Sequence, residues 1–190
     1  KAIELKADYE EAYLNLGIIL KSFGKLNEAI ESIQIAIKIK PDYAEAHSNL
    51  GIILKNLGRL KEAELSMRKA IQINPNSAIY YYNLSNILID LKNLNEAELS
   101  IFKSIQLKPE FVDSHMNLGL IYRDLGKSKE AELSLRKVIE LNPNLANAHY
   151  NLGNILIDLG NLQEAERCQR KAIELNPSFA NAYYTLGNIL

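Results

Sequence analysis

Apolar residues recur along this chain at intervals of three and four, which is the spacing of one face of an α-helix. Residues 44–57 follow this spacing, and Gly58 then supplies a residue that ends helices readily. A second amphipathic segment begins near Leu60 and stops before Pro75, because proline cannot donate a helix hydrogen bond and restricts the residue before it. This stretch therefore predicts two helices joined by a tight turn.

The same pattern returns every 34 residues, and columns of leucine, alanine and isoleucine keep register with the prolines. The five prolines are Pro41, Pro75, Pro109, Pro143 and Pro177. The full units are residues 10–43, 44–77, 78–111, 112–145 and 146–179, with the end of a preceding unit at 1–9 and the first helix of a further unit at 180–190. One helix pair cannot bury its own apolar stripe, whereas stacked pairs can, so residues 1–190 are expected to form a single all-α solenoid.

These columns resemble the tetratricopeptide repeat, whose unit carries an aromatic residue, Leu-Gly, a large residue, Ala, a large residue, Ala and Pro. In unit 146–179 the matching residues are His149, Leu152, Gly153, Leu156, Ala165, Gln169, Ala172 and Pro177. The resemblance covers the whole chain. It implies stacked helix-turn-helix repeats in a right-handed superhelix, with the first helices lining a concave groove where partner proteins bind.

Some positions depart from this pattern, namely Ser85, Lys92, Ser104, Val138 and Gln169. Lys92 stands where the other units place a glycine between their helices, and substitution of Lys92 by glycine is predicted to stabilise the chain if this residue must adopt a positive φ. Gln169 is polar where the other units carry a large apolar residue, namely Ile33, Met67, Ile101 and Leu135. None of these departures changes the predicted fold.

Composition narrows the range of functions. With 22 basic and 23 acidic residues and a net charge of -1, the chain lacks the basic surface that nucleic-acid binding requires. No apolar run approaches the length of a membrane span, and the single cysteine excludes a disulfide scaffold or a multi-cysteine metal site. A cytoplasmic location is therefore expected, with neither a membrane nor nucleic acid as a partner.

Candidate catalytic groups are few. The histidines, His47, His115 and His149, all occupy the aromatic column, where a packing role is expected, and none has a second ligand one helical turn away. Cys168 lies between two arginines that could lower its pKa, but no base column faces it. We therefore expect no catalytic, metal or cofactor site in these residues, and a protein that is not an enzyme.

A ladder of asparagines marks the sixth position of the units. Its members are Asn15, Asn49, Asn83, Asn117 and Asn151, and Thr185 follows them. An amide both donates and accepts hydrogen bonds, so such a ladder can hold the backbone of an extended peptide whatever its sequence. Alternatively, each asparagine bonds the neighbouring repeat. The ladder is similar to that in the repeat region of O-linked N-acetylglucosamine transferases, where it helps to present substrate peptides.

The residues expected around this ladder are mostly apolar, with some acids. The apolar and amide members are Tyr82, Asn86, Ile89, Met116, Leu120, Tyr150 and Asn154, and the acidic column is Asp90, Asp124 and Asp158. This groove predicts a protein or peptide ligand that is apolar with some positive charge, unless the tyrosines only pack between helices. Family members that dock acidic chaperone C-termini need lysine and arginine at the second, fifth and sixth positions. No unit here has them, so that ligand is not expected.

Three functions fit these features. The first is a protein-interaction scaffold that binds a partner segment in its concave groove. The second is the substrate-presenting region of a larger enzyme, such as a glycosyltransferase or sulfotransferase. The third is self-assembly, end to end, through the truncated units at 1–9 and 180–190.

Overall fold

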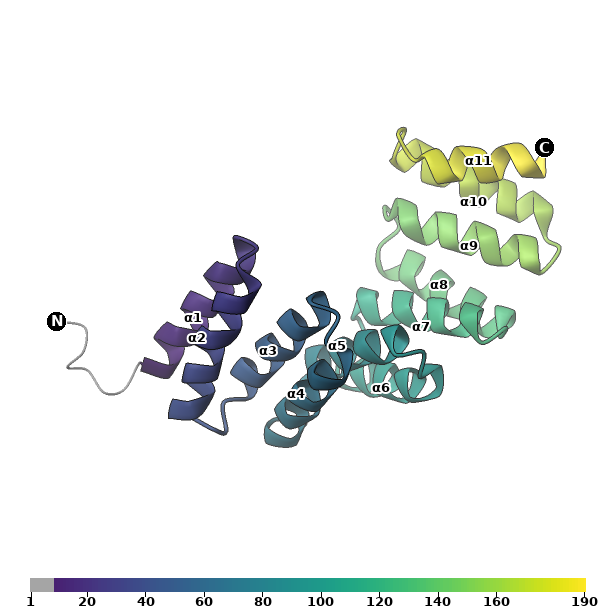
Figure 1. Ribbon diagram of the computed structural model, residues 1–190. Coiled ribbons are helices and arrows are strands. Elements are labelled where there is room, and N and C mark those ends of the chain that lie inside the picture. Colours follow the sequence, from purple (N-terminus) through teal and green to yellow (C-terminus); the bar gives the residue numbers. More distant parts are fainter. Residues whose placement is uncertain (1–8) are drawn as a thin grey trace. The chain divides into compact units, whose positions relative to one another are not determined.

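The computed structural model describes residues 9–190, and every regular element in that part of the chain is an α-helix (Figure 1). The helices are α1 (Tyr9–Ser22), α2 (Leu26–Ile39), α3 (Ala44–Asn56), α4 (Leu60–Ile73), α5 (Ala78–Asp90), α6 (Leu94–Leu107), α7 (Val112–Asp124), α8 (Ser128–Leu141), α9 (Ala146–Asp158), α10 (Leu162–Leu175) and α11 (Ala180–Ile189). Each repeat predicted from the sequence thus contains two helices, and the all-α class is confirmed.

Tight turns join the two helices of each repeat. At the end of α3, the Gly58 amide donates to Lys55 O and the Arg59 amide donates to Leu54 O, both at 2.9 Å. This is the Schellman pattern, which requires a positive φ at its central residue. Gly58 has a φ of 75°, and Lys92 at the matching turn has a φ of 62°. The positive φ expected at Lys92 is therefore confirmed.

A second kind of turn joins one repeat to the next. Helix α4 ends at Ile73, and the Asn74 side chain then accepts a hydrogen bond from the Asn76 amide at 3.2 Å. The same bond forms between Asn142 and Asn144 in a later repeat. Pro75 lies within the first of these turns, where it cannot continue the helix.

The paired helices approach closely because small residues lie between them. A Cβ atom added to Gly51 of α3 would stand 3.1 Å from the carbonyl oxygen of Ala63 on α4. Ala63 itself is fully buried. The close backbone contact expected at this pair is thus present, and it leaves no room for a larger residue at position 51 without displacement.

The chain forms two compact units, residues 1–100 and 101–190, and the boundary falls within α6. In the first unit the largest fully buried side chains are Leu14, Ile33, Ile53, Met67, Ile87 and Leu88. In the second they are Ile101, Ile121, Leu135, Ile155, Leu156 and Gln169. Each unit therefore has its own apolar core between first and second helices, and the second core includes one amide.

Arginines on the second helices link successive repeats. Arg136 bonds Glu132 on its own helix at 2.7 Å and Glu164 on α10 at 2.8 Å. Arg68 likewise bonds Glu64 at 2.9 Å and also reaches Glu96 on α6. The pairs within each helix follow the i,i+4 spacing of the sequence. The bridges to the next repeat do not follow from that spacing alone.

Candidate functional site

The first helices of the second unit enclose a hollow of about 460 Å³, here called the α9 groove. Its lining residues are Val112, Asp113, Met116 and Leu120 from α7, Leu145, Asn147, Tyr150 and Asn151 from the α9 segment, and Phe179 and Asn181 from the α11 segment. Four residues predicted from the sequence, Met116, Leu120, Tyr150 and Asn151, thus line one surface.

The lining of the α9 groove combines apolar and aromatic side chains with amides and one carboxylate. The rings of Tyr150 and Phe179 lie 4.9 Å apart between centroids and are tilted by 44°. Tyr150 is half-buried and still lines the hollow, so it packs against a neighbouring element and remains open to a ligand. Asp113 on α7 is exposed, and it gives this surface an acidic side chain.

Asn151 of the asparagine ladder has a contact with a neighbouring repeat. Its Nδ2 atom contacts the sulfur of Met116 in the preceding repeat at 3.6 Å, which is a weak hydrogen bond to a neighbour. Asn151 therefore lines the groove as well as contacting the preceding repeat.

In the first unit, the ladder residues have different surroundings. Asn15 is exposed, whereas Asn49 and Asn83 are half-buried. Asn49 donates to the carbonyl oxygen of Glu45 on its own helix at 3.0 Å, which holds the amide against α3. On α5, the predicted contact residues Tyr82, Asn86 and Ile89 are half-buried, and the adjacent Ile79 is 44% exposed.

The acidic column is partly neutralised within the protein. Asp90 on α5 forms an ion pair with Lys55 on α3 at 2.8 Å. Asp124 pairs with its neighbour Arg123 at 3.0 Å, whereas Asp158 on α9 is exposed and has no ion pair among the described residues. Of these three carboxylates, only that of Asp158 is therefore not neutralised by an ion pair within the described residues.

Two tyrosines near α3 have perturbed acidity. Burial raises the pKa of Tyr80, and the carboxylate of Glu45 raises it further. Burial and then Glu45 also raise the pKa of Tyr43, which immediately precedes α3. Both phenols consequently stay protonated at neutral pH and can donate hydrogen bonds.

Sequence reasoning missed five lining residues, Val112, Asn147 and Asn181 at the first two positions of their units and Leu145 and Phe179 at the last position. Leu145 and Phe179 each occupy the last position of a unit, immediately before a first helix, and both line the α9 groove. The same position holds Tyr9, Tyr43, Ser77 and Phe111 in the other units. The sequence did carry a signal for this position, because nearly every unit has a large apolar residue two residues after its proline.

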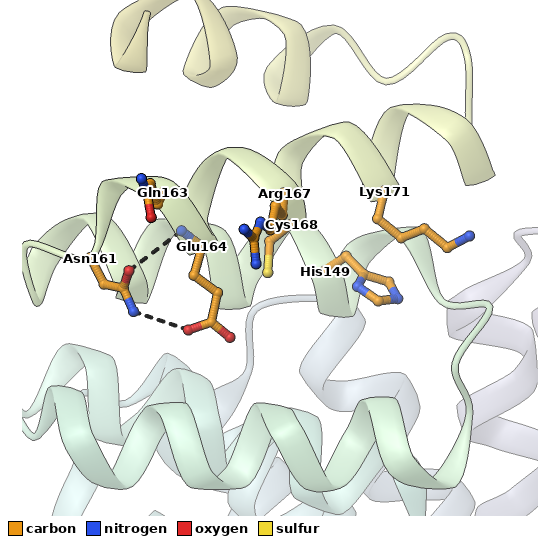
Figure 2. Close-up of a pocket in the computed structure, with 7 residues that line it drawn as sticks. All are labelled: His149, Asn161, Gln163, Glu164, Arg167, Cys168 and Lys171. Carbon is orange, nitrogen blue, oxygen red and sulfur yellow. Dashed lines mark hydrogen bonds between the residues drawn. The ribbon is translucent and has the colours of Figure 1, made fainter.

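A second hollow, of about 440 Å³, is polar and contains Cys168 (Figure 2). Figure 2 shows Asn161 hydrogen-bonded to Glu164 along α10, with distances of 3.0 and 3.4 Å. Burial, assisted by the carboxylate of Glu164 and opposed by Arg136, raises the pKa of the Cys168 thiol to about 11. The expectation that the flanking Arg167 and Arg170 could lower this pKa is wrong: the opposing charge comes from Arg136 on α8, and the loss of solvation outweighs it.

The histidines form a shared structural contact. His149 Nε2 lies 2.8 Å from the carbonyl oxygen of Pro143, and His115 and His47 contact Pro109 and Pro41 at 2.8 and 2.9 Å. Each ring thus holds the turn that leads into its repeat, as expected for the aromatic column. Within residues 9–190, no group of three or more His, Cys, Asp or Glu side chains is arranged to hold a metal ion.

Sequence profiles identify the family. Two profiles described as the tetratricopeptide repeat match residues 44–77 and 146–179, which are two of the units defined above. A third with that description matches residues 67–98, and one described as the TPR repeat matches 18–58 and 119–160. The chain belongs to the tetratricopeptide repeat (TPR) family. Together these matches span well over half of the chain, so the family predicted from the sequence is confirmed.

Solved TPR structures share this fold. PilF from Pseudomonas aeruginosa has a TM-score of 0.85 and 21% identity, covering 97% of this chain and 88% of that one. MamA from Desulfovibrio magneticus RS-1 has a TM-score of 0.83 and 21% identity, covering 92% and 98%. YrrB, described as a TPR protein with an unusual peptide-binding site, has a TM-score of 0.76 and 23% identity, covering 91% and 89%.

At these identities the likeness extends to the fold of the TPR array alone. No curated protein matches the chain in sequence. Among the described residues, no helix is long and apolar enough to cross a membrane.

Proposed function

We propose that this TPR array is a protein-interaction scaffold that binds an extended segment of a partner protein along its first helices. The observation that carries the proposal is the α9 groove, which is lined by an aromatic pair together with amide side chains. Aromatic surface in a concavity supplies binding energy, and amides supply hydrogen bonds to a peptide backbone. The proposal also draws on YrrB, whose description includes a peptide-binding site.

The lining residues favour a particular ligand chemistry. An apolar or aromatic side chain of the ligand would pack against Tyr150 and Phe179, with Met116 at its side. Asp113 favours a basic residue nearby, since it is the charged side chain among those lining the groove. A C-terminal carboxylate has no cation to meet there, so acidic chaperone tails are not the expected partners.

The test begins with selection of peptides from a random display library on the intact chain. Affinities of the selected peptides are then measured by fluorescence anisotropy for the wild type and for Tyr150→Ala. The expected loss is about tenfold or more, the size typical of an aromatic hot spot. Leu133→Ala is the matched control, because Leu133 is 69% exposed on α8 and does not line the groove.

Two outcomes would overturn this proposal. Selected peptides that bind Tyr150→Ala as tightly as the wild type would place their site elsewhere on the chain. An equal loss in Leu133→Ala would mean that the outer helices, rather than the α9 groove, hold the peptide. A role in presenting substrate peptides to the catalytic domain of a larger enzyme would use the same groove and remains a prediction. It is tested by asking whether a longer protein that contains this array modifies the selected peptides covalently.

End-to-end self-association is a second candidate, favoured by exposed apolar surface on the first and last helices. Phe23, immediately after α1, is 75% exposed, and Tyr184 on α11 is 74% exposed. Sedimentation velocity over a concentration series tests it with Phe23→Ser and Tyr184→Ser. A concentration-dependent increase in mass that either variant abolishes would support self-association, and a constant monomer mass would exclude it.

A further inference from the structure

Gln169 is a fully buried amide at a position that is otherwise apolar. The matching residues of the other repeats are Ile33, Met67, Ile101 and Leu135, and all are fully buried or nearly so. Gln169 lies against Gly153 of α9, where an added Cβ atom would stand 2.5 Å from its Nε2 atom. A methionine or leucine could fill this space without burying polar atoms, so simple packing does not explain the glutamine.

The hydrogen bonds of Gln169 fix which way its amide points. Its Nε2 atom donates to the carbonyl oxygen of Tyr150 at 3.3 Å and to Oδ1 of Asn154 at 3.2 Å. A backbone carbonyl can only accept, so the nitrogen of Gln169 must face Tyr150. Asn154 can then meet that same nitrogen only with its own carbonyl oxygen.

This arrangement carries a cost to stability. Gln169 Oε1 is buried and has no hydrogen-bond partner among the described residues. A buried acceptor without a partner is destabilising, because it has given up water without replacement. Buried polar atoms without hydrogen-bond partners tend to occur at functional sites, so Gln169 is a candidate for a functional role.

The effect of the network appears at Asn154 of α9, which is half-buried and does not itself line the α9 groove. Its Oδ1 is held inward by Gln169, so its Nδ2 group points the other way. The Nδ2 group has no hydrogen bond in the described part of the chain. A buried group of this kind would count as a buried atom without a partner, and Nδ2 of Asn154 does not, so it is exposed to solvent. Asn154 also lies one helical turn after Tyr150, on the same face of α9.

We propose that Gln169 is a positioning residue that makes Asn154 a hydrogen-bond donor next to the α9 groove, one helical turn beyond Tyr150. The ligand group that this donor selects is a main-chain carbonyl oxygen of an extended segment, one step beyond the side chain held by Tyr150. The inference rests on the proposed peptide-binding function.

The orientation can be tested without any ligand. In the ¹⁵N-labelled chain, the side-chain amide hydrogens of Gln169 are expected to exchange slowly with water and those of Asn154 rapidly. In Gln169→Met, which should fold because Met67 occupies the same position in another repeat, the Asn154 resonances are expected to shift. Rapid exchange at Gln169 together with protection at Asn154 would overturn the assigned polarity.

A double-mutant cycle tests the role in binding, with a peptide obtained by the display selection as the probe. Gln169→Met and Asn154→Ala are each expected to weaken its binding by about 3- to 10-fold, the net value of one hydrogen bond. In the Asn154→Ala background, Gln169→Met should cause no further loss, because its effect passes through Asn154. Leu135→Met is the matched control and should leave affinity unchanged.

The outcomes separate this inference from the proposed function. If Tyr150→Ala and Asn154→Ala weaken the peptide but Gln169→Met binds like the wild type, the groove function stands and the positioning role is wrong. If the two losses add in the double variant, Gln169 acts by another route and the inference also fails. If none of the variants affects a bound peptide, both proposals fall together.

Discussion

Lys92→Gly offers a quantitative test of backbone strain, because one turn uses lysine where the other four use glycine. A non-glycine residue in the left-handed region costs roughly 1–2 kcal/mol. Glycine at that position gives back about 0.4–1 kcal/mol by making the unfolded chain more flexible. The Lys92 side chain is exposed and makes no hydrogen bond or ion pair with the described residues, so its removal loses no contact. The variant should therefore gain up to about 1 kcal/mol.

Calorimetry and urea denaturation followed by circular dichroism measure this gain. For a chain of this length, 1 kcal/mol corresponds to a rise in Tm of about 2–4 °C. Gly58→Lys is the reciprocal control: its φ is 75°, and an added Cβ atom there meets nothing within 4 Å, so only strain should act. That variant should lose a similar amount. An unchanged or lower Tm in Lys92→Gly, alongside destabilisation in Gly58→Lys, would refute the strain argument.

Three further predictions concern packing, ion pairs and the thiol. Gly51→Ala should lower the free energy of unfolding in urea by about 1–3 kcal/mol, because the added Cβ meets the Ala63 carbonyl oxygen at 3.1 Å. Arg68→Ala should lower the free energy of unfolding by up to about 1 kcal/mol, because it removes ion pairs to Glu64 and Glu96 on two helices. The loss should be smaller in 1 M NaCl, which screens these charges. Arg170→Ala removes one ion pair on its own helix and should lower the free energy of unfolding less. At pH 8, Cys168 of the native chain, with a pKa of about 11, should react with Ellman's reagent far more slowly than Cys168 of the chain unfolded in urea. The rate of the native reaction should rise as the pH approaches 11. A fast native reaction at pH 8 would contradict burial as the cause.

The fold was predictable because its determinants are local and repeated. Proline at a fixed interval, glycine between the paired helices and apolar residues at helical spacing each specify structure within a few residues of themselves. Even the exception at Lys92 was interpretable, since the other repeats revealed what backbone conformation that turn needs. Because the same pattern of residues occurs in five units, a substitution in one unit does not hide it.

The groove was only partly predictable, because its members come from neighbouring repeats and from turns as well as helix faces. Helical spacing on α7 and α9 identified Met116, Leu120 and Tyr150. It could not identify Leu145 or Phe179, which precede their helices and therefore lie outside any helical face pattern. Spacing along one helix also cannot show that Arg136 forms an ion pair with Glu164 in the next repeat. This ion pair neutralises the Glu164 carboxylate, and the sequence alone does not identify Arg136 as its partner.

The amide of Gln169 marks the limit of reasoning from columns. The sequence shows that it departs from an apolar column, and that observation alone predicts nothing more than a weaker core. What gives the departure a consequence is the Tyr150 carbonyl, a backbone atom on another helix whose position no residue pattern encodes. That carbonyl sets the direction of the glutamine amide, which in turn sets the direction of Asn154. Sequence patterns can therefore place an amide on a groove, but whether it donates or accepts there depends on buried partners behind it.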